Sequence, residues 1–86
     1  MSKKINEFYH YADIESATVE GSIVYLWLKG GSLSTLQIDP NYWDGLDGAF
    51  KIADWLSWEI NDAIAIGSQA MLESALEQCN ATWGHN

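Results

Sequence analysis

The sequence contains no arginine, and its four lysines stand against twelve aspartates and glutamates, which gives a formal net charge of -8 at pH 7. Direct binding to nucleic acid is therefore excluded, because phosphate contacts need clustered Lys and Arg side chains. The longest apolar run, residues 23–28, is far shorter than the roughly 20 residues that span a bilayer, so no membrane contact is expected. Lys3 and Lys4 are followed by polar residues and not by the apolar segment of a signal peptide. The single cysteine, Cys79, is typical of a reducing compartment, and we expect a cytoplasmic protein.

A single proline, Pro40, and the lack of repeats or low-complexity stretches leave no candidate for a linker between two modules. The chain has 86 residues, of which 48% are hydrophobic and 19% are charged, a balance typical of a folded protein. A chain of this length cannot form two units that each bury a core. We therefore expect one domain that comprises residues 1–86.

Residues 17–39 have the pattern of an antiparallel β-meander. Apolar and β-branched runs are separated by glycine-containing breaks at residues 21–22 and 30–32, which predicts about three strands joined by tight turns. In the central strand, residues 23–28, both faces are apolar, and we expect helices to cover both of them. Tyr25 and Trp27 share one face of this strand. Two such aromatic side chains could form a platform on which a sugar stacks, or they could fill the hydrophobic core. We expect that they fill the core.

Two helices are predicted after this meander. Apolar residues recur every three or four positions from Leu46 to residue 64, and a second apolar stripe runs from residue 71 to residue 79. Gly67 and Ser68 predict the end of the first helix and the start of the second. A weaker pattern in residues 3–15 predicts a further helix or a strand, and residues 83–86 a loose tail in which Trp83 docks or stays free. The predicted fold is α+β, a meander packed against two or three helices.

Catalytic, cofactor and metal sites are not expected. The two histidines and Cys79 lack the spacing of metal ligands, and Cys79 lies in an apolar helix stripe that predicts a buried, unreactive thiol. The glycine pair at residues 30–31 lacks the helix and lysine of a phosphate cradle, and residues 44–48 lack the ligand order of a calcium loop. The helical carboxylates face away from the apolar stripes and toward water. Nothing there would remove water from a carboxylate and raise its pKa to that of a general acid. We therefore expect a protein that is not an enzyme.

The negative charge is concentrated in the helical half of the chain. Residues 1–43 carry a net charge of -2 and residues 44–86 a net charge of -6. A solvated, solubilising surface is one interpretation of these acids. The other is an interface with a basic partner, since Glu73 and Glu77 repel each other across one helical turn and Trp58 lies among the acids. The candidate partner-binding residues are Asp44, Asp47, Asp54, Trp55, Trp58, Glu59, Asp62, Glu73 and Glu77.

Two segments on the predicted helices resemble a known family. Residues 53–56 (Ala-Asp-Trp-Leu), Glu59 and residues 72–74 (Leu-Glu-Ser), after a hairpin over residues 24–38, are similar to acidic phage-encoded anti-CRISPR proteins that inhibit type I-F surveillance complexes. The resemblance spans roughly residues 20–77. It implies a small monomeric DNA mimic that blocks target-DNA binding by a type I Cas surveillance complex in the host cytosol. The contacts that it implies are Asp54, Glu59, Asp62, Glu73 and Glu77.

A second resemblance concerns residues 40–47, Pro-Asn-Tyr-Trp-Asp-Gly-Leu-Asp, followed by Phe50 and Leu56. This segment is similar to the loop and helix of barstar-type ribonuclease inhibitors, in which an acidic residue occupies the active site of a nuclease. It implies an immunity or antitoxin protein with a single nuclease as its partner. The remaining alternative is a small phage structural protein whose charge serves solubility alone. We rank the anti-CRISPR interpretation first and favour a monomer.

Overall fold

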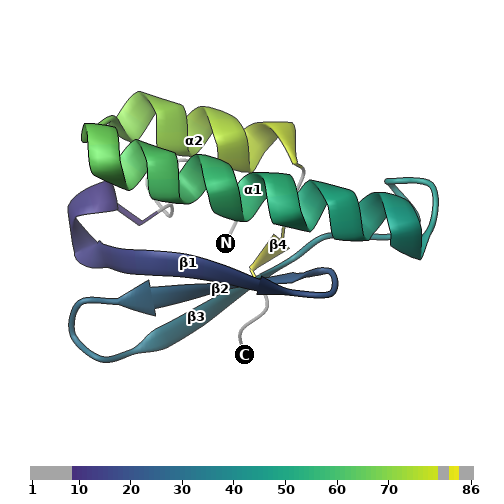
Figure 1. The fold of residues 1–86 in the computed structure, drawn as a ribbon, viewed down its shortest axis with the longest axis horizontal. Coiled ribbons are helices and arrows are strands. Elements are labelled where there is room, and N and C mark those ends of the chain that lie inside the picture. The colour runs from purple at the N-terminus through teal and green to yellow at the C-terminus, as the bar shows by residue number, and fades with distance from the viewer. Residues whose placement is uncertain (1–8, 80–81, 84–86) are drawn as a thin grey trace, which may run out of the picture.

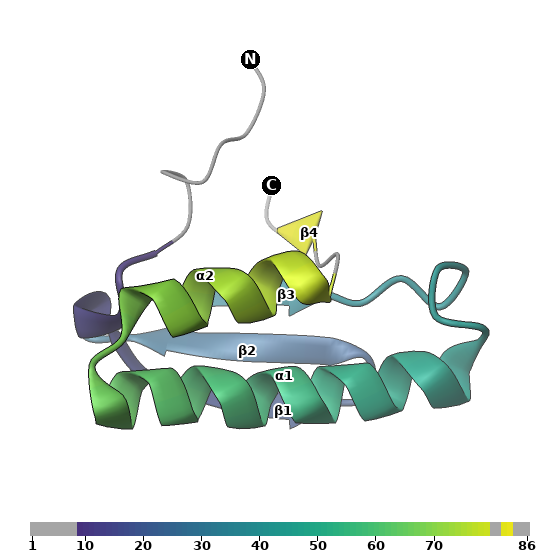
Figure 2. The same ribbon diagram turned by 90° about the horizontal axis from the view of Figure 1, so that it is seen from above.

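The computed structural model describes residues 9–79 and 82–83 and confirms the predicted α+β fold (Figure 1). Two helices lie side by side on one face of an antiparallel sheet (Figure 1). Seen from above, α1 lies over β1, and α2 lies next to α1 on the side of β3 (Figure 2). In chain order the elements are the 3-10 helix η2 (Tyr11–Asp13), β1 (Ile14–Glu20), β2 (Ile23–Leu28), β3 (Leu33–Gln37), α1 (Leu46–Ile66), α2 (Gln69–Gln78) and β4 (Thr82–Trp83).

The sheet has the strand order β1-β2-β3-β4, and every neighbouring pair is antiparallel. Val24 in the central strand lies opposite Val19 on one side and Leu36 on the other, which fixes the register of the meander. Gly21 makes the first turn with a φ of 65°, a left-handed conformation that favours glycine. The short strand β4, which pairs with the end of β3, was not predicted, because two residues carry no periodic signal.

The core lies between the sheet and the two helices, and alanines bring α1 close to the strands. Ala49, Ala53 and Ala63 are fully buried and lie before and after Leu56 and Ile60 on the same face of α1. Small side chains at these positions let the helix axis approach the sheet without leaving a void. The sheet contributes Val24 and Leu26 from alternate positions of β2 and Leu36 from β3, whereas the buried Ile14 and Ala17 of β1 are three positions apart because of an irregularity in the strand.

The helix boundaries follow the predicted signals. Gly67 ends α1 with a φ of 81°, and its N–H donates to the carbonyl of Ala63. The hydroxyl of Ser68 accepts from the N–H of Met71 at 3.1 Å and so caps α2. The prediction of a stop and restart at these two residues is therefore confirmed.

The prediction that helices cover both faces of the central strand is wrong. Both α1 and α2 lie on the face of Val24 and Leu26 (Figure 1). On the opposite face Trp27 is 44% exposed, so the prediction that it fills the core is also wrong. Tyr25 is half-buried beside it. Period-2 alternation shows that a strand has two apolar faces, but it does not show what lies against each of them.

The predicted helix over residues 3–15 is not present in its described part. Tyr11–Asp13 form a short 3-10 helix, and β1 begins directly afterwards at Ile14. The side chain of Gln69, at the start of α2, accepts from the N–H of Tyr11 at 2.8 Å and donates to the carbonyl of Tyr9 at 3.1 Å. This tertiary contact holds the segment in a non-helical path. Residues 3–8 of the predicted helix and residues 84–86 of the predicted tail lie outside the described residues.

Candidate partner-binding surface

Three of the predicted acids of α1, Asp47, Asp54 and the half-buried Asp62, form a row on one side of the helix. Asp47 and Asp54 are exposed, whereas the buried residues of α1 occupy the opposite side. A rise of 1.5 Å per residue separates Asp47 from Asp54 by roughly 10 Å along the axis, and Asp54 from Asp62 by roughly 12 Å. Lys51, the only cation in the helix sequence, lies between the first two acids. The row is therefore acidic but not uniformly so.

Trp58 lies in the middle of this row. Its side chain is 67% exposed, and Asp54 and Asp62 lie one helical turn before and after it. A shallow hollow of about 200 Å³ is lined by Trp58, Asn61 and Asp62. An indole so exposed gains almost nothing for the fold of this chain. The arrangement, an aromatic side chain between two carboxylates, is typical of an anchor residue at a protein interface.

Asn61 has a structural task, although the sequence places it among the acids. Its side-chain oxygen accepts from the N–H of Ala17 and its amide donates to the carbonyl of the same residue, both at 2.9 Å. Ala17 belongs to β1, the edge strand of the sheet, so the amide takes the position that a neighbouring strand would occupy. The sequence signal that identifies it is an amide at the border between the polar and the apolar side of the helix.

Trp55 and Glu59 lie on the flank of α1 that faces α2, and not in the row of Trp58. Trp55 is 38% exposed and Glu59 is half-buried. A groove of about 350 Å³ between the start of α1 and the end of α2 is lined by Trp43, Ile52, Trp55, Gln78 and Cys79. Across it the indole N–H of Trp43 donates to the carbonyl of Cys79 at 3.0 Å, which ties the loop before α1 to the end of α2.

Cys79 is buried, as its place in the apolar stripe predicts. Burial first, and the negative charge of Glu59 second, raise the pKa of the Cys79 thiol to about 12. The thiol is therefore protonated at neutral pH, and a thiol in this form is a poor nucleophile.

The remaining candidates lie apart from the row. Glu73 is half-buried and accepts from the side-chain amide of Gln69 at 3.0 Å, so part of its role is structural. Glu77 is exposed on α2. Asp44 is exposed in the loop before α1, with a positive φ of 67°. The structure thus places Asp47, Asp54, Trp58 and Asp62 on one helix side, and distributes the other candidates over the neighbouring flank, α2 and the loop.

The described part of the chain contains no group of three His, Cys, Asp or Glu side chains arranged to hold a metal ion. Across the same residues, neither helix combines the length and the apolar character that a membrane span requires. Comparison with protein-family models, with curated proteins and with solved structures finds no match for this chain.

Proposed function

We propose that this chain is a non-enzymatic binding protein that attaches to a basic, nucleic-acid-handling host protein through the solvent side of α1. The observation that supports it is Trp58, 67% exposed between Asp54 and Asp62. The tryptophan supplies apolar area at the centre of the contact, and the carboxylates favour a cationic partner and speed the encounter with it. A net charge of -8 directs this surface toward a basic protein and away from nucleic acid itself.

The proposed mode of action is mimicry of DNA phosphates. Acids separated by roughly 10 and 12 Å along α1 match every third or fourth phosphate of one strand, whose axial spacing is about 3.4 Å. A protein channel whose lysines bind those phosphates would accept the row in their place. The most specific form of the proposal follows the sequence resemblance: an anti-CRISPR protein that blocks target-DNA binding by a type I Cas surveillance complex.

The partner is found by immobilising the full chain, passing host lysate over it and eluting with a salt gradient. Recovery of Cas surveillance subunits that DNA displaces supports the specific proposal. Recovery of another DNA- or RNA-binding protein that nucleic acid displaces supports mimicry and rejects the Cas target. A partner that nucleic acid does not displace contradicts mimicry.

The contact itself is tested by variants of α1 against the recovered partner. Trp58→Ala should weaken binding by about thirtyfold or more, as expected for an interface anchor. Asp54→Asn combined with Asp62→Asn should slow association by roughly tenfold at low salt, because it removes the charges that steer the encounter. Lys51→Glu should strengthen binding, since it completes the acidic row.

The matched control removes two acids elsewhere. Asp13→Asn combined with Glu15→Gln changes the net charge by the same amount, and both residues are exposed outside α1. This control should bind almost as tightly as the unmodified chain. Equal weakening in both double variants would show that net charge alone matters, and unchanged binding of Trp58→Ala would reject the α1 surface.

The immunity-protein alternative places the contact in the loop before α1. Tyr42 in that loop is 59% exposed, and Asp44 follows it in a left-handed conformation. If the partner is a single nuclease, Tyr42→Ala and Asp44→Asn should weaken binding more than Trp58→Ala does. This ranking of three variants separates the two interpretations.

A further inference from the structure

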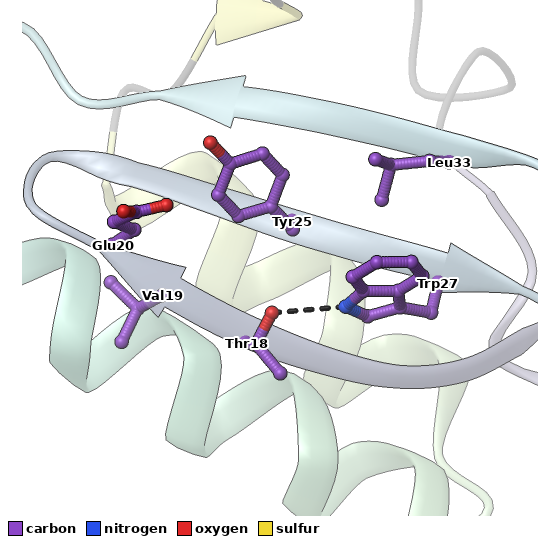
Figure 3. A pocket seen from close by; sticks show the side chains of 6 residues that line it. All are labelled: Thr18, Val19, Glu20, Tyr25, Trp27 and Leu33. Carbon is purple, nitrogen blue, oxygen red and sulfur yellow. Dashed lines mark hydrogen bonds between the residues drawn. The ribbon is translucent and has the colours of Figure 1, made fainter.

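The open face of the sheet, which neither helix covers, carries two aromatic rings. Trp27 on β2 is 44% exposed, and Tyr25, two positions earlier on the same face of the strand, is half-buried. Figure 3 looks onto this face and shows both residues around a hollow of about 570 Å³ whose floor is formed by β1, β2 and β3. The sequence allowed these rings either to fill the core or to form a stacking platform, and the exposure of Trp27 leaves the platform.

The ring of Trp27 is held in place by the strand beside it. Its indole N–H donates to the hydroxyl of Thr18 on β1 at 2.9 Å, so the ring extends from β2 toward β1 (Figure 3). The ring of Tyr25 turns a broad side away from the sheet in the same view. A ring that is already fixed loses little conformational entropy on binding, and its exposed side gives a ligand a surface on which to stack.

Polar groups lie beside the two rings. Figure 3 shows the carboxylate of Glu20 and the hydroxyl of Tyr25 at one end of the hollow, with Trp27 and Leu33 at the other end. The hydroxyl of Thr18 accepts from Trp27 and keeps its own hydrogen for donation. Hydroxyls that both donate and accept, together with a carboxylate that accepts, are suited to a ligand that itself carries many hydroxyl groups.

Charge and size restrict the class of ligand further. Among the described residues around the hollow no side chain is cationic, and the chain carries a net charge of -8, so phosphates and other anions are repelled. Three strands about 4.8 Å apart and roughly 20 Å long offer about 300 Å². A stable protein complex buries about 800 Å² per partner. The open face is therefore better suited to a small neutral molecule than to a second protein.

We propose that the open face of the sheet binds a neutral oligosaccharide whose sugar rings stack on Trp27 and Tyr25. The C–H groups on the flat side of a sugar ring carry a small positive charge and the face of an aromatic ring is negative, so the two attract each other. Two positions along β2 place the attachment points of the two aromatic rings about 6.8 Å apart, which lets neighbouring sugar units stack on them. A chain with equatorial linkages, such as a cello-oligosaccharide, is extended and flat, as this contact requires. The site is independent of the proposed function, because α1 lies on the other side of the sheet.

Titration of the full chain with cellohexaose, followed by ¹H–¹⁵N NMR spectra, tests this site. We expect saturable shifts of the Trp27 indole N–H and of the β2 amides, with a dissociation constant on the order of 1 mM, because few rings stack. Trp27→Ala should weaken binding about tenfold. Trp58→Ala is the matched control, since it removes an exposed tryptophan from α1, and it should bind like the parent. No saturable shift at about 10 mM cellohexaose, or equal weakening by both variants, overturns the proposal.

Further measurements keep the test decisive. If circular dichroism shows that Trp27→Ala does not fold, Tyr25→Ala replaces it, and unchanged binding by that variant overturns the proposal. Tetramethylammonium probes the alternative of a cation on the aromatic faces. Tighter binding of this ion than of cellohexaose, lost in Glu20→Gln, would overturn the proposal, whereas sugar binding should survive Glu20→Gln because the amide oxygen still accepts. Sugar binding should also persist in high salt, where binding of α1 to a basic partner weakens, so the two proposals fail separately.

Discussion

Gly48, in the first turn of α1, is held close to the loop that precedes the helix. A Cβ atom added there would lie 1.8 Å from the carbonyl oxygen of Trp43 and 3.0 Å from its carbonyl carbon. Real Cβ atoms keep about 3.0 Å or more from such atoms, so a substitution must move the loop and the helix apart by about 1.2 Å. Intrinsic helix propensity predicts the opposite, because alanine is favoured over glycine in a helix by about 1 kcal/mol.

The loop cannot move freely, because Trp43 is fixed at two points. Its N–H donates to the carbonyl of Asp39 at 3.1 Å, and its indole N–H donates to the carbonyl of Cys79 at 3.0 Å. Forcing overlapping atoms apart costs typically 1–3 kcal/mol, and each lost hydrogen bond costs about 1 kcal/mol more. After the gain in propensity, we expect Gly48→Ala to lower the free energy of unfolding by about 2–3 kcal/mol.

Urea denaturation followed by circular dichroism and tryptophan fluorescence measures this loss. In a domain of this size it corresponds to a decrease of roughly 10–20 °C in Tm. Gly30→Ala is the control, since a Cβ there meets nothing within 4 Å, and we expect its stability to stay within about 1 kcal/mol of the parent. A Gly48→Ala variant as stable as the parent, or more stable, would refute the steric argument.

Two further predictions concern Asn61 and Cys79. Asn61→Asp keeps an acceptor for the N–H of Ala17 but places a carboxylate against the carbonyl of Ala17. Chemical denaturation should show that the free energy of unfolding falls by roughly 1–2 kcal/mol. A variant as stable as the parent would show that water replaces the amide. The pKa of the Cys79 thiol is raised from 9.0 to about 12 in the folded protein. The contribution of this thiol to the free energy of unfolding is therefore fully present below pH 9 and is lost as the pH rises toward 12, because only the thiol of the unfolded chain ionises in that range. Denaturation of Cys79→Ala should show a shallower decline over the same pH range, and alkylation of the native thiol at pH 8 should be slow unless denaturant is added.

The sequence by itself determined the three-stranded meander and the two helices, but not the path of residues 9–16 or the short strand β4. The change from period-2 to period-3.6 spacing separates the meander from the helices. Gly67 and Ser68 specify the break between α1 and α2 through local backbone preferences. Asp47 and Asp54 of α1 were also placed correctly on its solvent side, since residues opposite a buried stripe must face water, whereas Glu59 is half-buried on the flank toward α2. Each of these properties depends on neighbours within a few positions of the chain.

Only the tertiary structure decided which surfaces are covered and which polar residues are already occupied. Asn61 is bonded to Ala17, 44 positions away in the sequence, and Gln69 to Tyr11, 58 positions away, so neither contact has a local signal. The exposure of Trp27 depends on both helices packing on the same face of the sheet (Figure 1). Glu73 and Trp58 look alike as surface candidates in the sequence, but one is hydrogen-bonded to its own helix and the other extends into solvent. Contacts between distant segments set these differences, and hydrophobic periodicity carries no information about them.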